Sequence, residues 1–260
     1  MGSLFLVDVH AHLQDEKLLP ECDEIVKRAE EAGVKRIINA GTCIETSKQA
    51  IEIARKHSSC LALAGVHPHD ASGANSATVD ELRKLAALPE VVGIGEIGLD
   101  FHYNFSPPEV QVAVFKSLWQ LAVELNLPAV IHVREAYEEF FAAISELPVP
   151  PKVMLHCFSG DLDIARRAAD LGFHFSIGGA LTFPKSETTR AVFKFLSADV
   201  IHLETDCPYL APQPKRGKRN EPAWLPLTLE HLAKVRGTTC DDLARILHLN
   251  AISFFGPRLA

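Results

Sequence analysis

Two histidines, one residue apart, end the first apolar stretch of the chain. They are His10 and His12 in the segment LVDVHAH. Side chains alternate along a β-strand, so these two imidazoles would face the same way with their Cα atoms about 6.5 Å apart. At that spacing both rings could reach one metal ion at a nitrogen–metal distance of about 2 Å. The alternative is a pair of histidines that only hydrogen-bond within a turn, and the spacing alone does not decide between the two.

Further residues of metal-binding type follow later apolar stretches. Glu96 ends VVGIGE, His132 and His156 lie in AVIHV and VMLHC, and Asp206 follows VIHLET. A buried carboxylate without a partner costs several kcal/mol, and metal coordination would remove that cost. The alternative for Glu96 is a buried salt bridge to Arg134. Because four residues recur at matching positions, we interpret them together with the histidine pair as one metal site.

The apolar stretches alternate with amphipathic segments, which is typical of repeated βα units. The candidate strands are 4–9, 36–40, 61–66, 91–96, 128–133, 152–157, 173–178 and 200–205, and amphipathic segments include 22–34, 46–57, 107–126 and 161–172. Asp161 and the pair Pro107–Pro108 indicate helix starts, and Gly172 indicates a helix end. Eight repeats in 260 residues predict one α/β domain over residues 1–260, a (β/α)8 TIM-type barrel, with a doubly wound open sheet as the alternative. In such a barrel the chemistry lies at the carboxyl ends of the strands, where the six candidate ligands fall.

Charge and cysteine usage limit the partners of the protein. The net charge is −7, so the chain lacks the broad positive surface of a non-specific nucleic-acid binder. The six cysteines are scattered without a C-x-x-C pair, which is typical of free thiols in a reducing compartment. No apolar stretch approaches the ~20 residues that span a bilayer. We therefore expect a cytoplasmic protein without a membrane or an obligate protein partner.

A phosphate-rich substrate would need local positive charge, and the sequence offers two sources. Arg134 follows His132 by two residues and could bind phosphate oxygens through two nitrogens. The alternative for Arg134 is a salt bridge to Glu135 or Glu138. The segment 215–219, KRGKR, follows the last strand and would overhang the metal site, with Arg216 and Lys218 as candidate substrate contacts.

Other polar and aromatic residues are expected at the same rim. His67 is a candidate substrate contact, and His69, Asp100 and His102 would either contact ligands or substrate or simply hydrogen-bond within their loops. The rings of Phe101, Tyr103 and Phe105 could stack on bases, although aromatic residues at a rim more often pack against the protein.

Seven segments, in this order, resemble one known family. They are VDVHAHL, GVHPH, GEIGLDFHY, IHVREA, LHCFSG, ETDCPYLAP and RGKRNEP, and they run from residue 7 to about residue 222, before a helical tail that ends in NAISFFG. They are similar to the TatD-related metal-dependent hydrolases of the amidohydrolase superfamily. The resemblance implies a TIM-type barrel with a two-metal centre and hydrolysis of phosphodiester bonds. Many members of the wider superfamily bridge their metals with a modified lysine, whereas the residue on the fourth strand here is Glu96.

The resemblance also implies a role for each candidate ligand. It implies that His10 and His12 hold one ion and that His132 and His156 hold the other. Glu96 would be the bridging carboxylate, and Asp206 would be a ligand that also orients the attacking water. A set rich in imidazole favours zinc, with manganese, nickel, cobalt and magnesium as alternatives.

Two reactions are compatible with such a centre. The expected one is exonucleolytic deoxyribonuclease activity, in which a metal-bound hydroxide attacks DNA phosphodiester bonds from a strand end, with Asp206 and Glu96 as the catalytic carboxylates. The alternative is a deacylase or amidohydrolase that acts on a carbonyl ester or amide such as aminoacyl-tRNA. The same hydroxide would serve both reactions, so the ligands do not discriminate between them.

Overall fold

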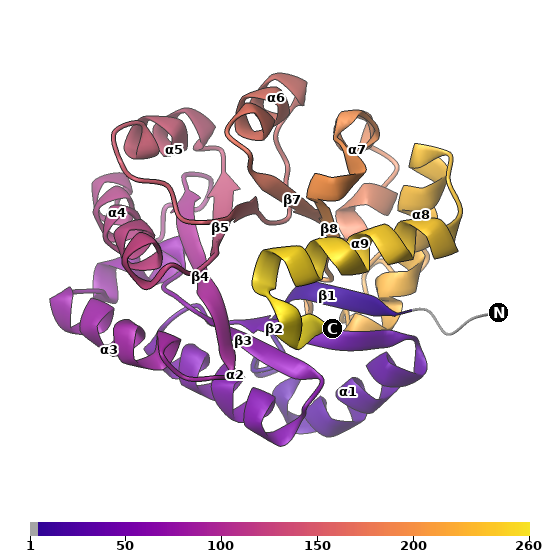
Figure 1. The fold of residues 1–260 in the computed structure, drawn as a ribbon, viewed down its shortest axis with the longest axis horizontal. Coiled ribbons are helices and arrows are strands. Elements are labelled where there is room, and N and C mark those ends of the chain that lie inside the picture. The colour runs from indigo at the N-terminus through magenta and orange to yellow at the C-terminus, as the bar shows by residue number, and fades with distance from the viewer. Residues whose placement is uncertain (1–4) are drawn as a thin grey trace.

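Eight parallel strands form the centre of the molecule in the computed structural model, which describes residues 5–260 (Figure 1). The strands are β1 (Leu6–Ala11), β2 (Val34–Ala40), β3 (Cys60–Ala64), β4 (Val91–Asp100), β5 (Ala129–Arg134), β6 (Val153–Leu155), β7 (His174–Ile177) and β8 (Ile201–Leu203). Each strand pairs in parallel with the next along the chain. The predicted (β/α)8 barrel is confirmed, and of the first predicted strand only Leu4 lies outside the described residues.

The barrel is closed by hydrogen bonds between β1 and the segment that follows β8. The backbone N–H of Asp206 donates to the carbonyl oxygen of His10 (2.9 Å), and the N–H of His12 donates to the carbonyl oxygen of Cys207 (3.0 Å). The open-sheet alternative is therefore wrong. This closure also places Asp206 beside His10 of β1 and His12, which directly follows β1.

Helices surround the strands. They are α1 (Cys22–Glu31), α2 (Ile44–Lys56), α3 (Ser76–Ala86), α4 (Pro108–Leu125), α5 (Tyr137–Ile144), α6 (Leu162–Asp170), α7 (Glu187–Phe195), α8 (Leu225–Arg236) and α9 (Cys240–Phe255). The predicted helix ends are confirmed: Pro107 and Pro108 begin α4, and the Asp161 carboxylate caps α6 by accepting from the N–H groups of Asp163 and Ile164. Gly172 follows α6 with a φ of 76°.

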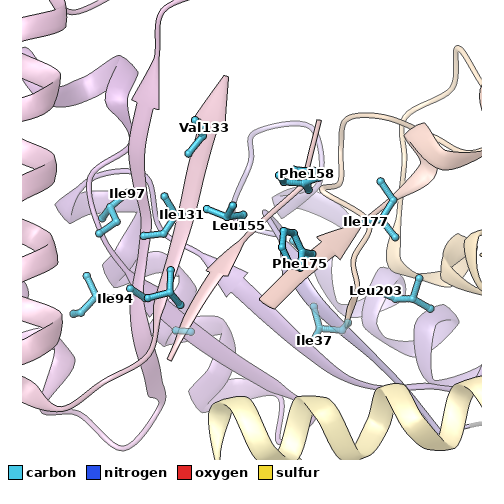
Figure 2. Packing of buried hydrophobic residues seen from close by; sticks show 14 of the residues in the cluster. Ile37, Ile94, Ile97, Ile131, Val133, Leu155, Phe158, Phe175, Ile177 and Leu203 are labelled. Atoms are coloured by element: carbon cyan, nitrogen blue, oxygen red, sulfur yellow. The ribbon is translucent and has the colours of Figure 1, made fainter. Parts of the chain in front are cut away.

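Two apolar clusters hold the barrel together. The larger lies between the strands and the surrounding helices, and Figure 2 shows part of it, with Ile97, Ile131, Leu155 and Phe175 contributed by successive strands. The smaller contains the inward side chains of six strands, among them Val9 and Val130, together with Phe254 and Phe255 of α9. Figure 1 shows α9 crossing one end of the strands. The other end, where the strands finish, is left for the site.

Two irregularities in strand register aim residues at that end. In β1, Asp8 pairs with Ile37 but Ala11 pairs with Asn39, so β1 carries one extra residue in the interval that contains His10. In β4, Ile94 and Ile97 both belong to the outer cluster although they are three residues apart. Gly95 and Glu96 between them form a bulge.

Two further observations concern expectations from composition. The six cysteines are all free. Within residues 5–260, no helix combines the length and the apolar character needed to cross a bilayer.

Candidate metal centre

A cavity of about 730 Å³ opens at the carboxyl ends of the strands. Its lining includes His12, His67, His69, Glu96, Asp100, Tyr103, His132, Arg134, His156, Asp206 and Tyr209. These residues come from β4 and β5 and from the segments after β1, β3, β4, β6 and β8. The barrel therefore gathers the separate motifs of the sequence into one place.

The Glu96 carboxylate lies at the centre of this group and is 3% exposed. Five imidazoles surround it: its Oε1 lies 2.7 Å from His156 Nε2, 3.0 Å from His132 Nδ1 and 3.5 Å from His67 Nε2, and its Oε2 lies 3.3 Å from His10 Nε2 and 3.6 Å from His12 Nε2. His10, Glu96 and His132 come from three separate strands of the barrel, β1, β4 and β5. The alternative salt bridge between Glu96 and Arg134 is absent from the described residues.

Donor atoms converge closely enough to hold metal ions. Within residues 5–260, three groups have donor atoms that all lie within 4.8 Å of one another: His10–Glu96–His156, His10–His12–Asp206 and His67–Glu96–His132. The buried Nδ1 atom of His10 has no hydrogen-bond partner among the described residues. A buried carboxylate shared by several imidazoles fits divalent ions well, because nitrogen and carboxylate oxygen are the usual ligands of zinc and related metals.

All six candidate ligands from the sequence belong to these groups. His12 Nε2 also lies 3.4 Å from Asp206 Oδ1, as expected for neighbours that could share an ion. The grouping adds His67, which the sequence suggested only as a substrate contact. It also brings His156 to His10 as well as to His132, whose Nδ1 lies 3.4 Å from His156 Nε2. The division of ligands between two ions stays a prediction.

Electrostatics in the cavity follow from burial and from the crowding of imidazoles. Burial alone would raise the pKa of Glu96, but His156, His67 and His10 hold that pKa well below its usual range. Burial opposes the charge on His156, yet Glu96 and Glu204 raise the pKa of His156 well above its ordinary value. Burial dominates at His67 and lowers its pKa well below the ordinary value. The carboxylate is thus ionised, and some of the imidazoles carry protons that a bound metal would displace.

Backbone and carboxylate groups behind the ligands fix the orientation of the rings. His12 Nδ1 hydrogen-bonds to the carbonyl oxygen of Ala40 (2.9 Å), which leaves Nε2 directed at Glu96 and Asp206. His132 Nε2 lies 3.0 Å from Asp100 Oδ2, so its Nδ1 faces Glu96. Such outer partners are typical of metal-binding histidines because they select the tautomer and the ring angle.

Two buried carboxylates, Glu204 and Asp8, lie behind the candidate ligands. Glu204 is fully buried; its Oε2 accepts a hydrogen bond from Ser176 Oγ (2.6 Å) and lies 3.7 Å from His156 Nδ1. Asp8 accepts from the N–H and hydroxyl of Thr205, and burial raises the pKa of Asp8 to about 7. An acidic residue inside the apolar run LVDV was the signal that could have identified Asp8.

The predicted substrate contacts divide into two groups. Arg134 and His67 line the cavity. The Arg134 guanidinium lies 4.9 Å from the centre of the Tyr103 ring, while its alternative partners are engaged elsewhere, Glu135 with His102 and Glu138 with Arg167.

The basic loop lies outside the lining of the cavity. In it, Arg216 stacks on Phe183 with 4.1 Å between guanidinium carbon and ring centre, and the N–H of Lys218 donates to the carbonyl oxygen of Lys215. Arg219 is held by Glu21 at 3.0 Å. Arg216 and Lys218 stay predicted contacts for a substrate that extends beyond the cavity.

Comparison with known proteins places these features in a family. The family model described as "TatD related DNase" matches residues 7–256. The chain is 39% identical over 258 residues to "3'-5' ssDNA/RNA exonuclease TatD" of Erwinia amylovora, covering 96% of this chain and all of that protein. It is 36% identical over 251 residues to "Uncharacterized metal-dependent hydrolase YabD" of Bacillus subtilis, covering 96% of this chain and 98% of the relative.

Solved structures agree with the sequence comparisons. The fold matches YJJV, a TatD homolog from Escherichia coli K12, with a TM-score of 0.91 and 26% identity over 96% of this chain and 97% of the other. It also matches a TatD family hydrolase from Entamoeba histolytica with a TM-score of 0.89 and 23% identity over 97% of this chain and 98% of the other, which shows the shared fold. With a family model spanning nearly the whole chain, this protein belongs to the TatD-related DNase family.

Proposed function

We propose that this protein is a metal-dependent hydrolase that cleaves the phosphodiester bonds of DNA from a strand end. The observation that carries the proposal is the buried Glu96 carboxylate, which imidazoles from several strands surround at the mouth of the barrel. Relatives that cover the same length are named as exonucleases acting on single-stranded DNA and RNA, which supports both the bond type and attack at an end.

The cofactor in this proposal is a pair of divalent ions, with zinc as first choice. His10, His12, His132 and His156 with Glu96 and Asp206 would hold them, and His67 is available beside Glu96. Such a pair activates water and neutralises the charge that develops on a phosphate during displacement.

The remaining chemistry belongs to the side chains. Asp206 is 15% exposed and lies at the cavity wall, where its free oxygen can accept a proton from the attacking water. Arg134 faces the same cavity and binds phosphate oxygens of the substrate through its planar guanidinium. Arg216 and Lys218 contact phosphates farther along the strand.

The free cysteines accord with a cytoplasmic location.

The decisive experiment compares substrates on enzyme loaded with zinc or manganese. Single-stranded DNA labelled at either end, single-stranded RNA and aminoacyl-tRNA are incubated separately, and products are resolved by size. We expect stepwise shortening of DNA from one end. Ester hydrolysis of aminoacyl-tRNA without cleavage of DNA under any metal would refute the proposal and favour the deacylase alternative.

Metal content provides a second test that does not depend on turnover. We expect up to two ions per chain in the wild-type protein, measured by elemental analysis after loading and desalting. His132→Ala should lower the metal content, because His132 lies 3.0 Å from Glu96 in the ligand group. His57→Ala is the matched control, since His57 pairs with Asp23 outside the cavity. Equal metal content in both variants would contradict the ligand assignment.

A further inference from the structure

Two aromatic side chains stand exposed beside the metal centre, on the loop that follows β4. Phe105 is 68% exposed and Tyr103 is 49% exposed, whereas Phe101, from the same segment, packs against the apolar core. The rings of Tyr103 and Phe105 stack with their centres 5.4 Å apart and their planes 16° apart. We call this pair the aromatic platform. The His69 ring lies edge-on to both, with its centre 4.7 Å from Phe105 and 5.6 Å from Tyr103, yet both rings keep a large exposed area that a planar ligand could cover.

The loop that carries the platform is firmly anchored. Asp100 Oδ1 accepts hydrogen bonds from the N–H groups of His102 (3.1 Å) and Tyr103 (3.0 Å). The buried amide of Gln111 donates to the carbonyl oxygens of Asp100 and Ser106. Because the backbone is held from beneath on both sides of the rings, little conformational entropy remains to be lost when a planar group stacks on them.

The same anchor connects the platform to the metal centre. The second oxygen of Asp100 lies 3.0 Å from His132 Nε2, so one carboxylate holds both the loop and a candidate metal ligand. Asp100 and Arg134 are also paired neighbours in β4 and β5, and the Arg134 guanidinium lies against the Tyr103 ring. A phosphate at Arg134 would therefore lie next to the platform.

The aromatic platform and the basic segment 215–219 lie at different sides of the barrel mouth. The platform follows β4, and the basic segment 215–219 follows β8, so the strand order places them on opposite sides of the mouth. A single strand that crosses the mouth can direct its phosphates toward the ions and the basic segment and one base toward the platform.

We propose that Phe105 and Tyr103 bind the planar base of a single-stranded nucleic acid by stacking and so position the neighbouring phosphate at the metal centre. The inference rests on the proposed action on nucleic acid and adds which residues bind a base of the strand. Aromatic stacking accepts every base because each has a π face, so this contact favours single strands without selecting a sequence. A base inside a duplex is already stacked and is not available to the platform.

The test pairs a change in the protein with a change in the base. Short 5′-labelled oligomers of thymidine and of 5,6-dihydrothymidine, whose ring is saturated and not planar, are made with phosphorothioate linkages that resist hydrolysis. Binding to the metal-loaded protein is measured by fluorescence anisotropy. We expect the wild type to prefer the thymidine oligomer about ten-fold, which corresponds to ~1.4 kcal/mol.

Phe105→Ala should reduce that preference to about one by weakening only thymidine binding, and Phe105→Trp should restore it. Phe195→Ala is the matched control, because Phe195 is also largely exposed and lies 5.2 Å from an arginine guanidinium, but belongs to α7 and not to the loop after β4. The control should keep the full preference. Thermal unfolding of each variant checks the fold.

The outcomes separate this inference from the proposed function. Equal weakening of both oligomers in Phe105→Ala, or no weakening of either, would overturn the platform even where the enzyme cleaves DNA. Binding that depends on Phe105 and on base planarity would support the platform, and if DNA were nevertheless not hydrolysed with any metal, only the proposed reaction would be refuted.

Discussion

Glu96 holds a negative charge at a position that is almost closed to water. Histidines replace the lost solvation, and they hold the pKa of Glu96 well below its usual range despite its burial. Removing a partner from a buried charged group is costly, because the remaining charge is left without compensation. Glu96 and its imidazoles therefore act as a unit, and single substitutions among them would not have additive effects. Asp206 is the ligand candidate that can be tested most independently, since it lies at the wall of the cavity.

Asp206→Asn should lower kcat by about 10²- to 10⁴-fold with a smaller effect on KM, because an amide cannot accept a proton from water. The rate is measured on single-stranded DNA with metal content monitored, so that a loss of metal is distinguished from a loss of the proton acceptor. Asp15→Asn is the control, since Asp15 lines the same cavity but belongs to none of the ligand groups. A kcat restored to the wild-type value by saturating metal would contradict the role of Asp206 as a base.

At the scale of the elements, the strands position the ligands through irregularities in register. A regular β1 would alternate strictly from Val9, which points into the barrel, and would turn His10 away from it. The extra residue in β1 corrects this phase, and the bulge in β4 does the same for Glu96. These details depend on the pairing of neighbouring strands rather than on local preference.

Features set within one strand could be predicted from the sequence, whereas features set by the pairing of strands could not. The apolar runs and their polar ends predicted the barrel and the candidate ligands, because strand ends recur at one face of a parallel barrel. The sequence offered Asp100 as a rim residue that could contact a ligand, but its pairing with His132, like that of Glu204 with His156, joins different strands and could not be read from the sequence. The aromatic residues 101, 103 and 105 were not distinguished by the sequence, and only the backbone of their loop separates the partly buried ring of Phe101 from the exposed pair.

Gly65, directly after β3, lies against the backbone of the Gly95–Glu96 bulge in β4. A Cβ at residue 65 would lie 2.6 Å from the carbonyl carbon of Gly95 and 2.8 Å from the N of Glu96, so the backbone around Glu96 would have to move. We expect Gly65→Ala to destabilise the protein by about 1–3 kcal/mol, as measured by urea unfolding, and to reduce metal binding. Gly73→Ala is the control, because nothing lies within 4 Å of a Cβ there. Equal unfolding free energies for the two variants would contradict this account.

At the scale of the whole molecule, the barrel has one open end and one packed end. The site occupies the open end, whereas α9 covers the other with Phe254 and Phe255. The sequence predicted a helical tail, but periodicity does not indicate which surface such a helix covers. Near α9 lies a pair of histidines that the proposed function does not use: His174 Nδ1 and His202 Nε2 are 2.9 Å apart, and both rings contact Phe254.

This pair should make stability depend on pH. Burial lowers the pKa of His174 to about 4 and lowers that of His202 well below its ordinary value. Below about pH 6.5 the unfolded chain binds protons that the folded protein does not, so stability falls as the pH drops from 6.5 toward 4. Each of these two neutral histidines lowers the free energy of unfolding by up to about 1.4 kcal/mol for every pH unit of acidification in this window.

His202→Asn removes one of these groups and isolates its contribution. The variant should be less stable than the wild type at pH 8, because it loses packing against Phe254. Its stability should fall less on acidification, so that the difference between the two proteins narrows between pH 6.5 and 4. Urea unfolding at several pH values measures the difference. Ile201→Val, a buried change in the same strand, should lower stability by about 0.5–1.5 kcal/mol equally at every pH. If the difference in unfolding free energy between His202→Asn and the wild type stayed constant with pH, folding would not change the pKa of His202, and this account would be wrong.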